Sequence, residues 1–84
     1  MTVEDTVRSV LKDVLALSDD RAAAFRDDTG LFGSLPELDS MAVAGLLTEL
    51  EDRLGIIVED DEVDGELLET FGHLVAFAKR KVAA

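Results

Sequence analysis

The chain has 84 residues, contains no cysteine and carries a formal net charge of −11 at pH 7. A chain of this length is expected to form one domain over residues 1–84 with one small core, which leaves little room for a deep active site. The charge argues against nucleic acid and anionic membranes as partners, since both would repel the protein, and the lack of cysteine excludes disulfides and thiolate metal sites.

Residues 3–17 are predicted to form an amphipathic helix. Thr2 and Asp5 resemble a capping box at its start, and apolar residues then recur at helical spacing, which gives one face to the core. The apolar residues are Val3, Val7, Val10, Leu11, Val14, Leu15 and Leu17.

Residues 18–38 break this pattern with turn-forming residues and are predicted to form a long loop that contains a short turn of helix at 22–25. Unstructured loops of this length are unusual in a compact domain unless they pack on themselves or serve a function. We therefore expect the apolar residues in its second half to fold back onto the core. These are Leu31, Phe32, Leu35 and Leu38.

A second helix is predicted to begin at Asp39 or Ser40 and to end near Leu54, where Gly55 is a typical residue after a helix C-terminus. Its buried stripe is predicted to be Leu46, Leu47, Leu50 and Leu54. The opposite side consists of small residues, namely Ala42, Ala44, Gly45 and Thr48. A glycine at position 45 costs about 1 kcal/mol relative to alanine, and it would let a partner or a tethered group approach the helix backbone.

The C-terminal third is predicted to be an extended linker at 56–58, an acidic segment at 59–65 and a last helix. Leu67 and Leu68 mark a candidate short helix between the acidic segment and the last helix. Thr70 is the predicted N-cap of that last helix, whose core-facing residues are predicted to be Phe71, Leu74, Val75, Phe77, Ala78 and Val82. The predicted fold is an all-α bundle of three to four helices, with the long loop between the first two.

Asp39 and Ser40 are the candidate functional residues. A helix N-terminus exposes unpaired backbone N–H groups and the positive end of the helix dipole, and therefore favours a phosphate group. Asp39 can cap the same turn with its carboxylate. This position suits a serine that carries a phosphodiester-linked group better than a serine that attacks a substrate, although a helix cap without further function explains the same two residues.

No catalytic constellation accompanies Ser40. His73 is the single histidine, and nothing in the sequence indicates that it lies beside Ser40, as a Ser–His–acid relay requires. Residues 60–71 resemble the start of a calcium-binding EF-hand loop, but Phe71 stands at the twelfth position, where that loop needs a bidentate glutamate. We therefore expect neither catalysis nor a metal site.

The whole outline resembles the acyl carrier protein family of fatty-acid, polyketide and peptide synthesis, whose members are small acidic helical bundles with a serine in Asp-Ser-Leu at the start of the second helix. Asp39-Ser40-Met41 matches this motif with methionine in place of leucine, and Glu69-Thr70-Phe71 resembles the opening of the family's last helix. Ile57-Val58 followed by acids resembles the family's Ile-Pro-acid stretch without its proline. Residues 35–38 depart from the Leu-Gly pair that fatty-acid carriers usually have.

The resemblance implies 4′-phosphopantetheine on Ser40, transferred from coenzyme A by a phosphopantetheinyl transferase, with Asp39 helping to present the serine. The thiol of the arm would hold an acyl group as a thioester and present it to acyl-transferring or condensing enzymes. The protein would be a cytoplasmic monomer that catalyses nothing. Residues 38–41 also resemble D-alanyl carriers, so an aminoacyl cargo loaded by an adenylating ligase is the alternative.

The resemblance also implies that partners bind the second helix, at Met41, Ala44, Gly45, Thr48, Glu51 and Asp52. This face has fewer carboxylates than the most acidic carriers, so apolar contact through Met41 and Ala44 is expected to matter more. An acidic helical adaptor without a prosthetic group is the competing hypothesis from another class, since it explains the charge and the size equally well.

Overall fold

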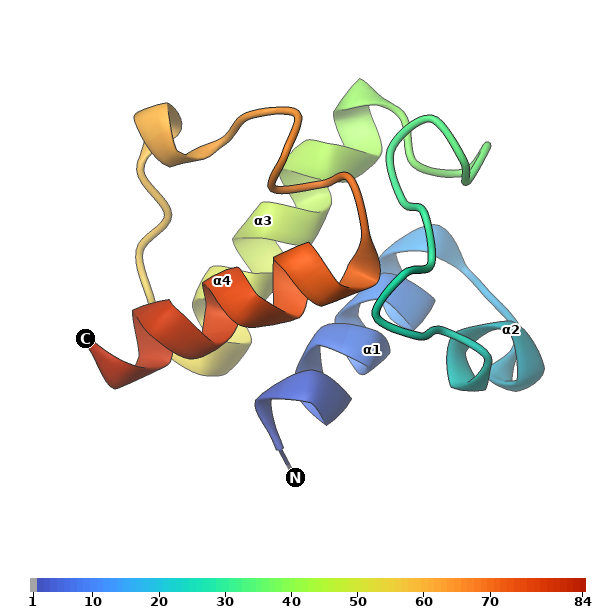
Figure 1. Cartoon of the computed structure of the whole chain (residues 1–84), viewed down its shortest axis with the longest axis horizontal. Helices are drawn as coiled ribbons and strands as arrows, with labels where there is room; N and C mark the ends of the chain where they lie inside the picture. Colours follow the sequence, from blue (N-terminus) through green and yellow to red (C-terminus); the bar gives the residue numbers. More distant parts are fainter. Residues whose placement is uncertain (1) are drawn as a thin grey trace.

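The computed structural model describes residues 2–84, in which loops join three long helices and two short helical segments (Figure 1). Within these residues no strand occurs, and Gly30 and Thr70 form one isolated antiparallel bridge. The all-α prediction is therefore confirmed. The elements are α1 (Val3–Leu15), α2 (Asp19–Ala23), α3 (Ser40–Leu54), the 3₁₀ turn η1 (Asp60–Glu62) and α4 (Phe71–Ala83).

Helix α1 begins with the predicted capping box and ends two residues earlier than predicted. The Thr2 hydroxyl accepts a hydrogen bond from the Asp5 N–H at 3.1 Å, and the Asp5 carboxylate accepts one from the Thr2 N–H at 3.3 Å. Ala16 adopts a left-handed conformation with φ 54°, which ends the helix. Leu17 lies beyond this end but is still buried, because its N–H bonds back to the Lys12 carbonyl at 2.9 Å.

The loop between α1 and α3 packs onto the core, with two differences from the sequence prediction. The short helix α2 begins at Asp19, earlier than the predicted turn at 22–25, because the Ser18 side chain caps it. Leu31 and Leu38 are buried as predicted, whereas Phe32 is 52% exposed. Phe32 is the first residue of a turn over residues 32–34, which is closed by hydrogen bonds from the N–H groups of Ser34 and Leu35 to the Leu31 carbonyl at 3.0 and 2.8 Å.

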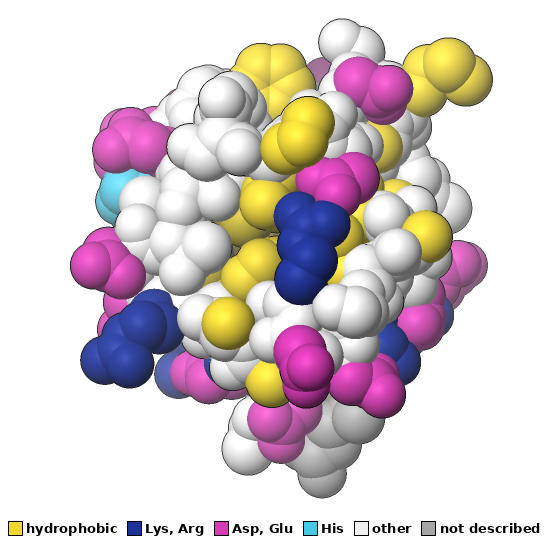
Figure 2. All heavy atoms as spheres, turned by 90° about the vertical axis from the view of Figure 1, so that its right-hand side faces the viewer, with side chains coloured by type: hydrophobic (Ala, Val, Ile, Leu, Met, Phe, Trp, Pro, Cys, Tyr) yellow, Lys and Arg dark blue, Asp and Glu magenta, His cyan; other side chains and the backbone are white. Residues whose placement is uncertain are grey.

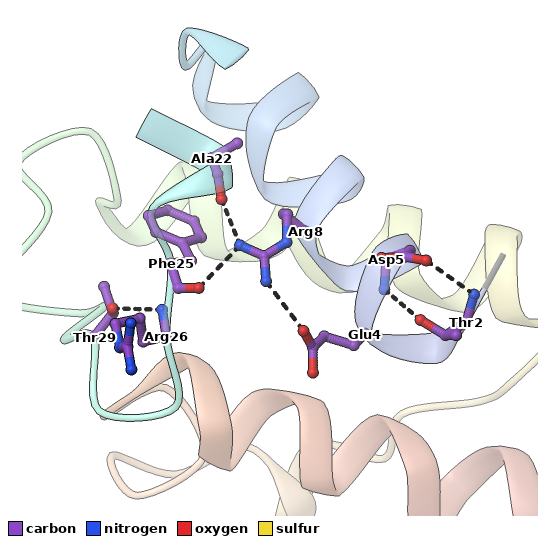
Figure 3. A network of polar contacts seen from close by, with 8 residues as sticks. All are labelled: Thr2, Glu4, Asp5, Arg8, Ala22, Phe25, Arg26 and Thr29. Atoms are coloured by element: carbon purple, nitrogen blue, oxygen red, sulfur yellow. Dashed lines mark hydrogen bonds and ion pairs between the residues drawn. The ribbon is translucent and has the colours of Figure 1, made fainter. Parts of the chain in front are cut away.

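Arg8 fastens this loop to α1, a role that the sequence analysis missed (Figure 3). Its guanidinium donates to the carbonyls of Ala22 and Phe25 at 2.6 and 3.0 Å and pairs with the Glu4 carboxylate at 3.1 Å. The same group lies 4.9 Å from the centroid of the Phe71 ring in α4. One partly buried cation thus holds α1, the end of α2 and the start of α4 together.

Helix α4 begins after its predicted N-cap, Thr70, and is joined to the loop by its first backbone N–H groups. The N–H of Phe71 donates to the Thr29 carbonyl at 2.8 Å, and that of Gly72 donates to the Asp27 carbonyl at 2.9 Å. These bonds satisfy donors that a helix N-terminus otherwise leaves unpaired. The loop before α3 is therefore anchored to the start of α4.

Two predictions for the C-terminal third are wrong. Leu67 and Leu68 form no helix but lie buried in the turns before α4, and the short helical turn is η1, where the Glu62 carboxylate accepts from the Glu59 N–H at 2.9 Å. Val82 was predicted to face the core and is 45% exposed. The buried face of α4 ends at Ala78, so the last turn extends past the bundle.

The core lies between α1, α3 and α4. From the predicted stripe of α3, Leu46 and Leu50 are fully buried, and Leu47 and Leu54 pack at its edge. On the side of small residues, Ala44 and Thr48 are exposed, whereas Ala42 packs against the core and Gly45 is half-buried.

Candidate functional site

Ser40 is the first residue of α3 and its side chain is exposed. Asp39 is the N-cap, and its carboxylate accepts a hydrogen bond from the Ala42 N–H at 2.8 Å. The carbonyl of Asp39 accepts from the Val43 N–H at 2.9 Å. This geometry places the Ser40 hydroxyl at the rim of the helix, where a second protein could reach it.

The first turn of α3 keeps two backbone donors available. In the part of the chain that the structure describes, the N–H groups of Ser40 and Met41 have no protein acceptor. The first turn of α3 also contains no acidic side chain. Free N–H groups at the positive end of a helix dipole stabilise a phosphate, so the site suits a phosphodiester at Ser40.

The segment that leads into Ser40 is held from both sides. Leu38 is buried beneath it. Glu37 forms a bidentate ion pair with Arg21 of α2, with one contact between Nη2 and Oε1 at 3.2 Å. The hydrogen bond from Arg21 lowers the pKa of Glu37 below its ordinary value, and partial desolvation opposes this shift. The backbone before the serine is thus tied to α2 at neutral pH.

A groove of about 350 Å³ opens beside Ser40. It runs between the start of α3 and the segment after η1, which crosses over α3 in Figure 1. Its walls are mostly apolar, with one carboxylate from Asp64. The lining residues are Phe32, Ser40, Val43, Val63, Asp64, Gly65 and Leu68. A flexible chain attached to Ser40 could therefore lie against apolar surface.

Two large apolar side chains are exposed around the serine. Met41 is 85% exposed and Phe32 is 52% exposed. Figure 2 shows the side of the molecule that carries α2 and the 24–39 loop. Apolar side chains are exposed toward the upper edge of this view, and α3 begins at the same end of the molecule in Figure 1. Large apolar side chains are therefore exposed near Ser40, together with the carboxylates of Asp39 and Asp64.

The residues predicted to bind partners fall into two groups. Met41, Ala44, Thr48 and Asp52 are exposed on α3. Gly45 is half-buried and faces α1, since a Cβ built on it would lie 3.7 Å from a methyl group of Val14. Glu51 is also half-buried, because its carboxylate accepts a hydrogen bond from the Val58 N–H at 2.9 Å. The structure thus brings only the first group together as an accessible surface.

The remaining candidates of the sequence analysis lie away from this site. His73 lines hollows beside α4, none of which includes Ser40. Among residues 2–84, no group of three or more histidine, aspartate or glutamate side chains is arranged to hold a metal ion. In the same range, no helix is long and apolar enough to cross a membrane.

The sequence analysis missed the groove residues Phe32, Val43, Val63 and Leu68. Val43 occupies a helical position one turn after Ser40, so the helical period would have placed it beside the serine. Phe32, Val63 and Leu68 come from irregular segments distant in sequence, for which periodicity gives no signal.

Two comparisons bear on this site. The family model described as the phosphopantetheine attachment site matches residues 5–78. The chain is also similar to a holo acyl carrier protein from Nitrosomonas europaea, whose structure was determined by solution NMR. The two chains are 38% identical, each is covered over 100% of its length, and the TM-score is 0.89.

Proposed function

Because the chain belongs to the acyl carrier protein family and contains its phosphopantetheine attachment domain, we propose that Ser40 is the residue that carries 4′-phosphopantetheine. The observation that supports this assignment most directly is the exposed Ser40 hydroxyl at the N-terminus of α3, beside two free backbone N–H groups and an apolar groove. The chain itself acts as a carrier and not as an enzyme.

The residues around Ser40 suit each part of the group. The N–H groups of Ser40 and Met41 would stabilise the phosphodiester, and Asp39 would hold the first turn of α3 in place through its hydrogen bond to Ala42. The groove would accept the apolar parts of the arm or its cargo. When bound, the group supplies the thiol that a cysteine-free chain lacks, and this thiol holds the acyl cargo as a thioester.

Partners would include a phosphopantetheinyl transferase and enzymes that load or use the cargo. We assign their docking surface to the exposed residues of α3, Met41, Ala44, Thr48 and Asp52, together with Phe32 from the loop. The large exposed apolar groups lie next to Ser40, and large apolar side chains dominate the energetics of many interfaces. Apolar contact would therefore contribute more than charge at this end of α3.

Two classes of cargo fit the site. An acyl chain would use the apolar walls of the groove. An aminoacyl group is favoured by one observation, the Asp64 carboxylate at the groove beside Ser40, which could pair with an ammonium group. The mass of the cargo on protein isolated from its native host separates the two classes, because an aminoacyl group contains nitrogen and a simple acyl group does not.

The assignment of Ser40 is tested by incubation with coenzyme A and a broad-specificity phosphopantetheinyl transferase. We expect the intact mass to rise by one phosphopantetheine group in the wild type and to stay unchanged in Ser40→Ala. Ser34→Ala is the matched control, since Ser34 is an exposed serine of the preceding loop, and it should be modified like the wild type. A wild-type mass that does not change, or a modified Ser40→Ala, would contradict the assignment and favour the adaptor without a prosthetic group.

A further inference from the structure

Few polar contacts hold the segment before Ser40 to the rest of the protein. Residues 33–39 form the loop that enters α3 in Figure 1, and their backbone hydrogen bonds are local. The Leu35 N–H donates to the Leu31 carbonyl at 2.8 Å, and the Leu38 N–H donates to the Leu35 carbonyl at 3.1 Å. These bonds shape the loop, but they do not fix it relative to α1, α2 or α4.

The ion pair between Glu37 and Arg21 connects this segment to α2. Among residues 2–84, no other hydrogen bond or ion pair joins residues 33–39 to α1, α2 or α4. Glu37 lies three residues before Ser40, so the pair acts on the backbone directly ahead of the serine. Both side chains are partly exposed, Arg21 by 47% and Glu37 by 31%. A planar guanidinium that binds both carboxylate oxygens fixes the orientation of its partner as well as its distance.

The helix that carries Arg21 is itself fastened to α1 at both ends. At the start of α2, the Lys12 ammonium of α1 pairs with the Asp19 carboxylate at 2.6 Å. At its end, the Arg8 guanidinium of α1 binds two backbone carbonyls. The ion pair with Glu37 therefore holds the segment before α3 against an element with a fixed position.

Apolar packing defines the position of this segment less sharply than the ion pair does. Leu38 is buried, but the hydrophobic effect is non-directional. A transferase has to bind the Ser40 hydroxyl together with the backbone around it, and a segment that is ordered beforehand loses less conformational entropy on binding. The apparent affinity scales with the fraction of molecules in the competent arrangement, so loosening of residues 33–39 would weaken docking without changing the chemistry at the hydroxyl.

We propose that Arg21 is a positioning residue for the modification of Ser40 and that, through Glu37, it holds the backbone ahead of α3 in the arrangement that a phosphopantetheinyl transferase binds. In the transfer, the Ser40 oxygen bonds to the phosphorus next to the pantetheine arm, the phosphoanhydride of coenzyme A breaks, adenosine 3′,5′-bisphosphate leaves and the hydroxyl proton is released. The role of the pair in transfer rests on the proposed function. The ordering of residues 33–39 does not, because it follows from contacts of the unmodified chain.

Steady-state transfer of phosphopantetheine from coenzyme A, well below the unfolding midpoint, tests the role of Arg21. In Arg21→Met and in Glu37→Gln, we expect the KM for the carrier to rise about 2- to 5-fold, as the loss of a partly exposed ion pair should produce, with kcat unchanged. Arg26→Met is the matched control, because Arg26 is exposed in the same loop and its side chain forms no ion pair among residues 2–84. An unchanged KM in Arg21→Met, a fall in kcat alone, or an equal rise of KM in Arg26→Met would overturn the proposal.

A charge-reversed pair separates positioning from direct contact with the transferase. Arg21→Glu and Glu37→Arg alone each place two like charges face to face, which should raise the KM. The double variant restores an ion pair between the two positions but reverses the charge that each position offers to a partner. We expect it to recover most of the KM change of the single variants. A double variant no better than either single variant would mean that the two side chains act by touching the transferase, and would overturn the positioning role.

Hydrogen exchange of the unmodified protein tests the ordering of the segment on its own. The Leu38 amide should exchange about 2-fold faster or more in Arg21→Met than in the wild type, whereas the Val63 amide, which bonds to the Asp60 carbonyl within η1, should keep its rate. Unchanged exchange at Leu38 would overturn the ordering. A wild type that the transferase leaves unmodified would overturn the proposed function and the role of the pair in transfer, whereas a modified wild type with equal KM in Arg21→Met would overturn the positioning role alone.

Discussion

Gly45 and Gly72 are both helical glycines, but their surroundings predict opposite effects of alanine. A Cβ at Gly45 would make an ordinary contact with Val14 at 3.7 Å, whereas a Cβ at Gly72 would lie 2.7 Å from the backbone carbonyl oxygen of Asp27. We expect Gly45→Ala to raise the free energy of unfolding by up to about 1 kcal/mol. Gly72→Ala should lower it by about 1–3 kcal/mol, because the backbone must shift.

Urea unfolding of the two variants and the wild type measures both effects, and each variant controls for the other. A loss of stability in Gly45→Ala would mean that α3 and α1 approach more closely at this point than the structure indicates. Gly45 would then be required for the packing of α3 against α1.

Single residues also show what the sequence could and could not predict. The caps at Thr2, Asp39 and Thr70 were predictable, because each depends on a bond to a residue three positions away. The role of Arg8 was not predictable, because its acceptors are carbonyls 14 and 17 residues away. A carbonyl exists at every residue, so nothing in the sequence distinguishes those two.

At the scale of elements, the ion pair between α2 and the segment before α3 predicts a pH-dependent contribution to stability. The hydrogen bond from Arg21 lowers the pKa of Glu37 below its ordinary value near 4.5 in the folded state. A lowered folded-state pKa stabilises the protein above the unfolded pKa, and this stabilisation is lost as the pH falls through the folded value. Arg21→Met should therefore unfold more easily than the wild type at pH 7, and this difference should be smaller at about pH 3.

Urea midpoints at the two pH values measure this difference, and comparison with the wild type removes the effect of the other carboxylates. Arg26→Met serves as the control, since Arg26 is exposed in the same loop and its side chain forms no ion pair among residues 2–84. If the difference between Arg21→Met and the wild type were the same at both pH values, the ion pair with Glu37 would not be its cause.

The helices and the loop differ in how well the sequence predicts them. Helices α1, α3 and α4 follow the apolar period and their caps, so their positions were predicted to within about two residues. The loop before α3 and the segment between α3 and α4 depend on contacts between parts of the chain that are distant in sequence, such as the bond from the Leu31 N–H to the Glu69 carbonyl at 3.0 Å. Ser40 was therefore predictable as a candidate, whereas the groove beside it was not.

At the scale of the whole molecule, the balance of charge predicts how salt acts on stability. The chain has 19 acidic and 8 basic residues, and among residues 2–84 only six carboxylates form ion pairs. The molecule measures 31 × 27 × 21 Å. The Debye length is about 30 Å at 0.01 M salt and about 8 Å at 0.15 M. Repulsion therefore acts across the whole molecule at the lower concentration and only between neighbours at the higher one.

We accordingly expect the midpoint of thermal unfolding to rise when sodium chloride increases from about 0.01 M to about 0.15 M, because screening weakens the repulsion that destabilises a highly charged folded state. Calorimetry or circular dichroism measures the midpoint, and potassium chloride should give the same rise if screening is the cause. A midpoint that falls with salt would mean that the surface ion pairs outweigh the excess of negative charge.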